Sequence, residues 1–436
     1  MQEKQKQTGL IWFGNDLRIR DNEVLAKAAQ ENDRLIGIYC LSPSLIKTTN
    51  FGFRKLGVHR AKFLLETLSD LKESLAQKNI SLLVYFERPE KKIPETCTKF
   101  TIQKIYKQQE WTSEEIAEVK QVQARIPEIS IKEIYNQFLY QPEDILSDPQ
   151  KIPNVFTAFR KKLEKYVDIR LEAETIPTFD SCNLVKEENH LPSLIDLGFE
   201  SIESDSRTAF PFEGGEQAAL DRLEDYFFTT KKLGFYKKTR NGLVGKDYSS
   251  KFSPWLANGS ISARTIYWQV KKFEKEHYKN QSTYWLIFEL IWRDYFKYIS
   301  IKYQDDIFKI GGILHKDYEW SQDEQKINQW IHGETQDDFV NANMLELKYT
   351  GWMSNRGRQN VASYFAKELL LDWRIGAAYF EEQLIDYDVH SNYGNWMYVS
   401  GVGNDPRDRK FNTQLQAERY DGHGRFRKLW LQETLF

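Results

Sequence analysis

The chain has 436 residues, 41% hydrophobic and 28% charged, so it is long enough for two domains, and its formal net charge of −2 argues against a protein that coats nucleic acid indiscriminately. Its three cysteines, Cys40, Cys97 and Cys182, are too far apart for a local metal knuckle, so we expect neither a metal site nor a disulfide framework. No apolar run is long enough to cross a membrane and residues 1–8 lack a targeting signal, so we expect a cytoplasmic protein without a membrane partner.

Short apolar runs alternate with amphipathic helical stretches in the first third of the chain. Strands are expected near Leu10–Phe13, Leu35–Cys40, Ser81–Phe86, Ile102–Tyr106 and Ile129–Tyr135. The alternation predicts an α/β domain over residues 1–140, built on a doubly wound parallel sheet that binds ligands beyond the carboxyl ends of its strands. Asp21 and Asn22 precede an Ala-rich amphipathic run and are expected to cap a helix.

The pattern changes after residue 140. Residues 141–215 have weak periodicity and many Pro, Ser and Glu residues, which predicts an interdomain connector on the surface. Residues 216–436 have helical periodicity almost throughout and predict an all-α domain. Between Lys231 and Lys297 there are 14 Lys and Arg residues against 5 Asp and Glu, which fits either a phosphate-binding face or a solvated helical surface.

Two helix-like stretches in the all-α region place polar groups among apolar ones. In the first, 282–303, Glu289 falls on a face formed by Trp285, Phe288, Trp292, Phe296 and Ile299. A buried carboxylate needs a partner, and Arg293 at i+4 is the simplest one. The second begins near Ser354 and puts Asn355, Arg358, Gln359 and Ala362 in one row. A polar row on a core-facing side predicts a lined cavity or a hydrogen-bonded network.

Two further segments carry polar groups between helical stretches. Residues 239–256 combine glycines, hydroxyls and cations and then begin a helix with Ser253 at the cap and Pro254 next, where free backbone N–H groups are able to hold a diphosphate. Residues 386–396 place two acids and several amides before Trp396, which is also typical of a surface loop with Asx turns.

Taken together, these stretches resemble the DASH-type cryptochromes of the photolyase and cryptochrome superfamily. The matching runs are residues 239–256, 288–296, 350–359, 372–374 and 386–405, and the resemblance extends over essentially the whole chain. It implies an N-terminal α/β domain followed by a helical domain that binds FAD. Gly14 and residues 337–341 depart from the usual pattern of the family.

The resemblance implies the cofactor-binding residues by position. Those expected to bind FAD are Tyr236, Ser249, Ser250, Lys251, Phe252, Ser253, Glu289, Arg293, Trp352, Asn355, Arg358, Asp386, Asp388 and Asn392. Among them, Arg358 and Asp386 are expected to form an ion pair against the flavin ring, and Asn392 to lie beside its redox-active nitrogen. Trp396, Trp373 and Trp320 match three tryptophans that relay an electron from the surface, although aromatic packing alone also accounts for indoles in a helical core.

The same resemblance implies a light-driven DNA-repair enzyme, a deoxyribodipyrimidine photo-lyase. Glu289, Trp292, Asn355 and Gln359 match a pocket that receives a flipped cyclobutane pyrimidine dimer, which is split after one electron arrives from excited reduced FAD. Tyr398 replaces a tryptophan of double-strand photolyases, which suggests a preference for single-stranded or looped DNA.

Other functions remain open from the sequence alone. The main alternative is a blue-light receptor that signals through flavin photoreduction, and a more distant one is a nucleotide-binding transferase built on the N-terminal domain. The resemblance also implies an antenna chromophore, methenyltetrahydrofolate, for which Glu110 is the expected contact, and we expect a monomer.

Overall fold

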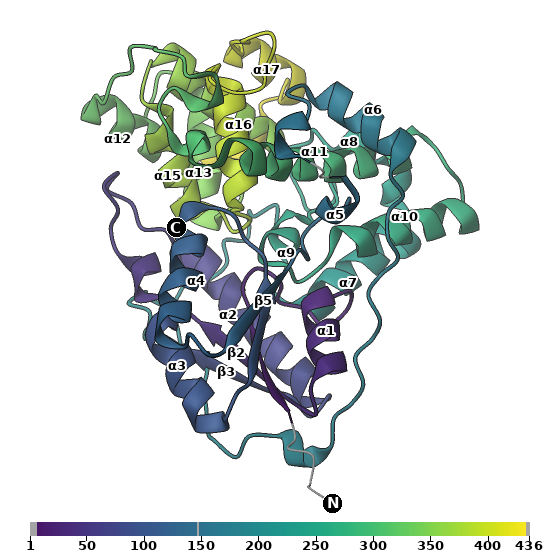
Figure 1. Cartoon of the computed structure of the whole chain (residues 1–436). Coiled ribbons are helices and arrows are strands. Elements are labelled where there is room, and N and C mark those ends of the chain that lie inside the picture. The colour runs from purple at the N-terminus through teal and green to yellow at the C-terminus, as the bar shows by residue number, and fades with distance from the viewer. Residues whose placement is uncertain (1–6, 146–147, 433–436) are drawn as a thin grey trace, which may run out of the picture.

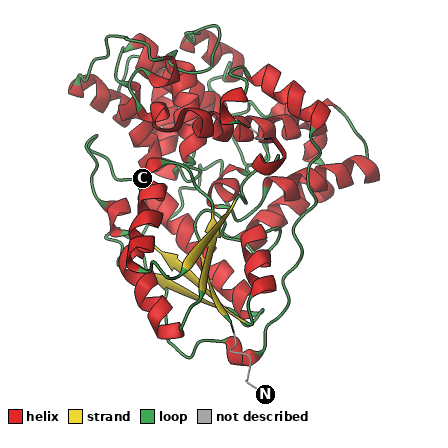
Figure 2. Ribbon diagram, viewed as in Figure 1, coloured by secondary structure: helices red, strands yellow, loops and turns green. Residues whose placement is uncertain are grey.

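A parallel sheet with helices on both faces forms one end of the molecule, as a computed structural model that describes residues 7–145 and 148–432 shows (Figures 1 and 2). Its strands are β1 (Thr8–Trp12), β2 (Arg34–Cys40), β3 (Ser81–Tyr85), β4 (Lys104–Gln108) and β5 (Ser130–Ile134). All neighbouring strands pair in parallel, in the order β3-β2-β1-β4-β5. The predicted strands and the doubly wound fold are thereby confirmed.

Alternation along the strands divides the apolar side chains between two cores. On one face, Ile11 and Leu82 pack under α1 (Glu23–Glu31) and α2 (Val58–Ala76). On the other, Leu10 and Leu83 pack under α3 (Pro89–Phe100) and α4 (Ser113–Arg125). The strand order reverses between β1 and β4, so a crevice opens beyond their carboxyl ends, where this fold class binds ligands.

The segment after the sheet contains a helix that the sequence pattern did not predict. After α5 (Pro142–Ile145), helix α6 (Phe156–Tyr166) buries Phe156, Phe159 and Leu163 in the same hydrophobic core as the C-terminal helices. The chain then runs in an extended path past the sheet, as the teal loop of Figure 1 shows, before the C-terminal helices begin. The domain limits predicted at residues 140 and 215 remain predictions.

Residues from 216 onward are helical almost throughout, as predicted. The helices are α7 (Glu216–Glu224), α8 (Tyr236–Thr239), α9 (Ser253–Asn258), α10 (Ala263–Glu276), α11 (Gln281–Tyr303), α12 (Glu324–His332), α13 (Asp338–Thr350), α14 (Asn355–Ser363), α15 (Trp373–Gln383), α16 (Val389–Ser400), α17 (Thr413–Tyr420) and α18 (Arg425–Leu431). Shorter 3-10 or π turns of the whole chain are η1 (Pro43–Ile46), η2 (Pro149–Lys151), η3 (Ser181–Asn183), η4 (Asp225–Thr229), η5 (Lys232–Phe235), η6 (Gln304–Phe308), η7 (Gly312–Leu314) and η8 (Tyr364–Glu368). Within the two described ranges no helix is both long and apolar enough to cross a membrane.

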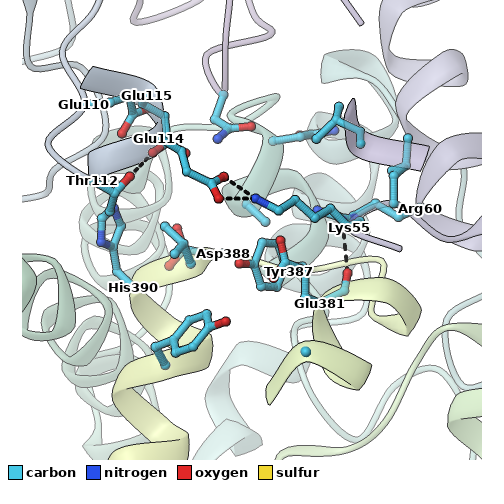
Figure 3. Close-up of a pocket in the computed structure, with 18 of the residues that line it drawn as sticks. Lys55, Arg60, Glu110, Thr112, Glu114, Glu115, Glu381, Tyr387, Asp388 and His390 are labelled. Atoms are coloured by element: carbon cyan, nitrogen blue, oxygen red, sulfur yellow. Dashed lines mark hydrogen bonds and ion pairs between the residues drawn. The ribbon is translucent and has the colours of Figure 1, made fainter. Parts of the chain in front are cut away.

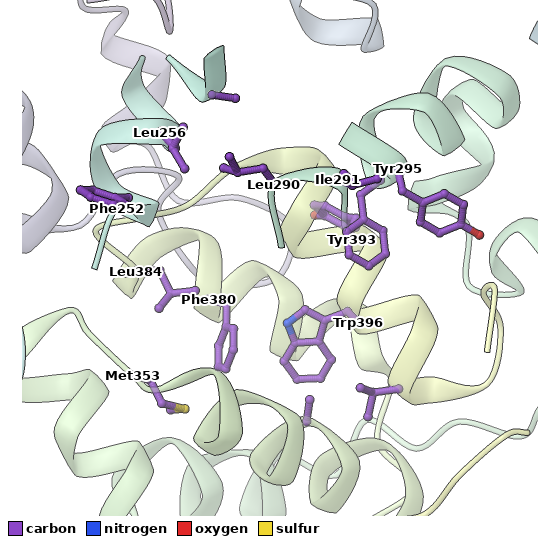
Figure 4. Packing of buried hydrophobic residues seen from close by; sticks show 14 of the residues in the cluster. Phe252, Leu256, Leu290, Ile291, Tyr295, Met353, Phe380, Leu384, Tyr393 and Trp396 are labelled. Atoms are coloured by element: carbon purple, nitrogen blue, oxygen red, sulfur yellow. The ribbon is translucent and has the colours of Figure 1, made fainter. Parts of the chain in front are cut away.

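Aromatic side chains fill the space between the C-terminal helices. Trp396 of α16 lies edge-on to Phe380 of α15, with ring centroids 5.2 Å apart (Figure 4). Helix α11 lies along the same core through Leu290, Ile291 and Tyr295. One continuous core therefore fixes the mutual positions of the helices whose ends carry polar groups.

Buried ion pairs join the sheet to the helices. Asn22 caps α1 as predicted, since its side chain accepts from the N–H of Leu25. Asp21 does not cap it: its carboxylate accepts from Arg264 of α10 at 2.7 Å, and both side chains are almost completely buried. The prediction for Asp21 was wrong because a long-range charge pair outcompetes local capping at this position.

We expect Asp21→Ala to destabilise the protein by about 3–5 kcal/mol, because it leaves the Arg264 guanidinium buried without its main partner. Urea denaturation followed by circular dichroism measures this change. Glu172→Ala, which breaks a partly exposed pair with Arg20, is the matched control and should cost about 1 kcal/mol or less. Equal losses in the two variants would contradict the assigned role of the buried pair.

Candidate active site

A cavity of about 260 Å³ opens between the ends of the C-terminal helices. It is lined by 13 of the 14 residues predicted to bind the cofactor, namely Tyr236, Ser249, Ser250, Lys251, Phe252, Ser253, Glu289, Arg293, Trp352, Asn355, Arg358, Asp386 and Asp388. The fourteenth, Asn392, lines an adjoining cavity of about 100 Å³. The two cavities share Asn355, Arg358, Asp386, Asp388 and Ser391, so they adjoin each other, and we call the pair the branched cavity.

Lys251 brings a buried ammonium group into this space. Its backbone is left-handed, with φ 67°, and its Nζ lies 3.3 Å from the ring centroid of Tyr248 and 4.5 Å from that of Trp352. Among the described residues Nζ has no hydrogen-bond partner, and burial lowers the pKa of Lys251 well below its ordinary value. An unpartnered donor on a cavity wall suits a ligand that carries acceptor oxygens.

Glu346 of α13 is the acid whose charge acts most strongly on Lys251. It is 1% exposed, and burial raises its pKa to about 8, although the charges of Lys251 and Arg358 act in the opposite direction. The carboxyl group is therefore protonated at neutral pH, which avoids the cost of a buried charge.

The polar row predicted on the second helix does line a cavity. Asn355, Arg358, Gln359 and Ala362 of α14 all lie on the wall of the smaller space. Arg358 donates to Oδ2 of Asp386 at 2.9 Å, which confirms the predicted ion pair. Oδ1 of Asp386 is buried and lacks a partner among the described residues, so it remains free to accept from a ligand.

Asp388 is held at the junction of the cavities from two directions. It caps α16 by accepting from the N–H of Ser391 at 2.7 Å, and it accepts from Nζ of Lys297 in α11 at 2.8 Å. Burial alone would raise its pKa, but Lys297, His390 and Arg293 hold the pKa well below its usual range. Asp388 is therefore a fixed negative charge on the cavity wall.

The prediction that Glu289 pairs with Arg293 was wrong. Arg293 turns away from it and donates to the backbone oxygens of Gln137, at 2.6 Å, and Leu256, at 2.9 Å. Glu289 instead contacts Arg240, which follows α8. The predicted helix face is also less buried than expected, since Trp285, Phe288 and Trp292 remain partly exposed.

Serine capping at the start of α9 was also wrong. The helix begins at Ser253 as predicted, but its cap position is Phe252 and no side-chain hydrogen bond closes the turn. The hydroxyl of Ser253 therefore remains on the cavity wall instead of being used by the backbone.

Of the remaining predicted substrate residues, only Gln359 lines one of the two cavities. Trp292 stacks on Phe156 of α6, with ring centroids 3.6 Å apart and planes within 10°, and Tyr398 stands edge-on to it at 6.0 Å. Neither Trp292 nor Tyr398 is among the residues that line the two cavities. Gln359 is on the cavity wall, where its side-chain oxygen accepts from Arg356 at 2.8 Å.

The three predicted relay tryptophans differ in burial, and only Trp396 lines a cavity of the site. Trp396 is 2% exposed and lines the smaller cavity, and it packs so closely on Gly376 that a Cβ there would collide with its ring. Trp373 begins α15 one turn before Gly376 and is fully buried. Trp320 is partly exposed, and the next residue pairs through its backbone with Leu370 and Asp372, beside Trp373.

A larger cavity of about 590 Å³ lies between the sheet and the helices (Figure 3). Asn15 and Gln108, at the carboxyl ends of β1 and β4, line it together with Glu110. Glu110 accepts from the amide of Gln108 at 2.7 Å, and burial raises its pKa to about 7. Asp388 lines this cavity as well as the smaller two, while Ala257 and Arg293 are shared with the cavity of about 260 Å³ and Tyr387 with that of about 100 Å³, so the three spaces adjoin one another.

Comparison with known proteins agrees with this geometry. Residues 9–178 match the family described as DNA photolyase, and residues 285–435 match the family described as the FAD binding domain of DNA photolyase. Cryptochrome DASH of Gloeobacter violaceus is 44% identical over 435 residues, which cover 98% of this chain and 86% of that protein. The chain belongs to the DASH-type cryptochromes of the photolyase and cryptochrome family.

Solved structures of this family have the same architecture. A cryptochrome from Synechocystis sp. PCC6803 is similar with a TM-score of 0.92 and 44% identity, over 98% of this chain and 88% of that one. An archaeal photolyase from Sulfolobus tokodaii, crystallised with two FAD molecules, is similar with a TM-score of 0.79 and 26% identity, over 98% of this chain and 90% of that one. The helical half of this cryptochrome therefore carries an FAD-binding domain.

Several residues at the site of this DASH-type cryptochrome were missed from the sequence. Arg240, Lys297, Glu346 and Phe156 act on predicted site residues, yet each comes from a different element. Arg240 lies within the quoted run 239–256, so its position was visible but its partner was not. Phe156 carried no signal because it falls in the segment taken for a connector.

We expect Glu346 to contribute stability that is lost as pH rises from about 4.5 to about 8, by about 1.4 kcal/mol per pH unit at most, because its carboxyl group ionises only in the unfolded chain over this range. Glu346→Gln removes this one titrating group and should make the profile less steep by that amount. Denaturant titrations at pH 5, 6.5 and 8 measure this, and Glu276→Gln on the exposed side of α10 is the control. A Glu346→Gln profile as steep as that of the parent protein would contradict the assignment.

Proposed function

We propose that this cryptochrome is a deoxyribodipyrimidine photo-lyase, which uses bound FAD and light to repair cyclobutane pyrimidine dimers, preferentially in single-stranded or looped DNA. The observation that carries the proposal is the branched cavity, in which residues expected to hold the cofactor and residues expected to read a damaged base share one wall. Asn355 belongs to both expected sets and lines both branches.

The chain offers FAD a charged and polar wall. Lys251, Ser249, Ser250 and Ser253 would hold the diphosphate end, because one unpartnered ammonium and several hydroxyls line that branch. Arg358, Asp386, Asp388 and Asn392 would surround the flavin ring, with the free Oδ1 of Asp386 as an acceptor. When bound, FAD supplies light-driven transfer of one electron to the dimer and its return.

Glu289 would recognise the base edge of the dimer. In the structure its carboxylate contacts Arg240, so a base that enters takes over part of that contact. Phe156 already covers one face of Trp292, so a dimer is able to stack only on the opposite face. The free energy needed to extrude the dimer is lowest in unpaired DNA, which supports the single-strand preference. The phenol of Tyr398, which stands in place of a larger indole, supports the same preference.

The basic segment 231–297 is less available to phosphates than its composition suggests. Lys251, Arg264 and Lys297 are each at most 3% exposed and face the interior. Lys231 and Lys238 are exposed, and both lie shortly before Arg240 in the sequence. We propose that these exposed cations contact the DNA backbone near the cavity.

Glu289→Gln should lower light-dependent repair of a dimer-containing oligonucleotide by about 10- to 100-fold, since a hydrogen bond to a charged group contributes about 1.5–3 kcal/mol. Bound flavin, measured by its absorption spectrum, should stay unchanged. Glu276→Gln is the matched control and should repair at the parent rate. Full repair by Glu289→Gln, or colourless protein that takes up no added FAD, would refute the proposal.

Blue-light signalling is the second candidate function, favoured by the series of tryptophans that ends at the partly exposed Trp320. Trp373→Phe should abolish photoreduction of the bound flavin, because it removes the easily oxidised middle ring. Repair started from chemically reduced protein should persist. Trp330→Phe, which replaces a buried indole outside the predicted series, is the control. Normal photoreduction in Trp373→Phe would exclude this series as the route.

The larger cavity would hold the antenna chromophore. We propose methenyltetrahydrofolate with Glu110 as a contact, supported by a volume of about 590 Å³ and a carboxyl group whose pKa is raised to about 7. The archaeal relative crystallised with two FAD molecules makes a second flavin the competing occupant. A monomeric, cytoplasmic protein remains part of the proposal.

A further inference from the structure

Tyr318 lies directly against the outermost tryptophan of the predicted series. Its ring and that of Trp320 meet edge to face, with centroids 5.6 Å apart and planes at 82°. Both residues are partly exposed and belong to the loop between η7 and α12. Nε1 of Trp320 is buried and has no hydrogen-bond partner in the described parts of the chain. The two rings are therefore in aromatic contact, with no hydrogen bond between the indole N–H and the phenol.

The hydroxyl group of Tyr318 is oriented by two charged side chains. Nζ of Lys316 donates to it at 3.0 Å, and the hydroxyl donates to Oδ2 of Asp408 at 3.2 Å. An ammonium group has donors only, so the hydroxyl oxygen must accept from Lys316 and direct its proton to Asp408. A base at this distance is close enough to remove the proton.

Asp408 is equipped to act as that base. Its other carboxylate oxygen, Oδ1, accepts from Nζ of Lys367 at 2.6 Å. Burial raises the pKa of Asp408, but the hydrogen bond from Lys367 and the charges of Lys367 and Lys316 hold it below its ordinary value. The side chain is 41% exposed, so a proton that it receives is able to pass on to water.

We propose that Tyr318 is the terminal electron donor of the tryptophan series, with Asp408 as the acceptor of its proton. Trp320, once oxidised by one electron, receives an electron from the ring of Tyr318, and the hydroxyl proton moves to the Asp408 carboxylate. The products are neutral Trp320, a neutral phenoxyl radical and a carboxylic acid, so charge and atoms balance. The inference rests on the proposed tryptophan relay, whose oxidant is the photoexcited flavin.

Loss of the proton determines whether the step is favourable. A phenol is hard to oxidise while it keeps its proton, since the resulting radical cation is strongly acidic. Coupling electron loss to proton transfer removes this obstacle and leaves the hole on a neutral radical. The effect is to move the hole one residue farther from the flavin, which slows its return.

Time-resolved absorption and electron paramagnetic resonance test the proposal on the FAD-loaded protein after a blue flash. In the parent protein an indole radical should give way to a phenoxyl radical, more slowly in D2O. In Tyr318→Phe the phenoxyl signal should be absent and the indole radical should persist about tenfold longer, which corresponds to about 1.4 kcal/mol in the barrier. Asp408→Asn should slow the conversion by a similar factor, while Tyr166→Phe, at an exposed tyrosine, should change nothing.

Failure of this proposal is distinguishable from failure of the relay. If the flash yields no indole radical, the relay is wrong, and Tyr318 is then tested on the same FAD-loaded protein with a soluble ruthenium photosensitiser that oxidises Trp320. Trp320→Phe identifies the part of that signal that passes through Trp320. An indole radical that never converts to phenoxyl, or a phenoxyl radical that survives Tyr318→Phe, overturns the inference in either experiment.

Discussion

The buried pair of Lys297 and Asp388 is the constraint on which the site depends. Lys297 belongs to α11, the helix that also carries Glu289, and Asp388 begins α16, the helix that carries Asn392 and Trp396. Separation of the pair would leave two charges uncompensated in the interior, so the two helices are held in one relative position. Because Asp388 lines all three cavities, the same contact also fixes the wall between them.

The charged groups in and around this site are therefore of two kinds, those already paired within the protein and those free to contact a ligand. Arg264 and Lys297 form ion pairs with buried acids, and Arg293 donates hydrogen bonds to backbone oxygens, which links the helices to the sheet. Lys251 and one oxygen of Asp386 are left without partners among the described residues. These two unsatisfied polar atoms belong to residues that line one cavity, which suits a polar ligand, and the match to an FAD-binding domain supplies its identity.

The aromatic residues form two groups with different environments. Trp396 and Trp373 are buried in the core, and the indole of Trp396 packs closely on Gly376. Trp320 and Tyr318 lie at the edge, among charged side chains that are able to exchange protons with water. Dry packing preserves the geometry that electron transfer needs, whereas the wet edge allows a proton to follow the electron.

The sequence alone determined the strand and helix pattern and the polar row of α14, because alternation and helical spacing are local signals, whereas the set of cofactor-binding residues follows from the family resemblance and remains a prediction. It could not assign Arg240 to Glu289, Arg264 to Asp21 or Phe156 to Trp292, since each pair joins segments far apart in the chain. For Glu289 and Asp21 the partner or role expected from neighbouring residues was replaced by a contact that the packing of distant segments creates. Only the tertiary structure decides such pairings, because a buried charge or ring responds to what surrounds it in space and not to its spacing along the chain.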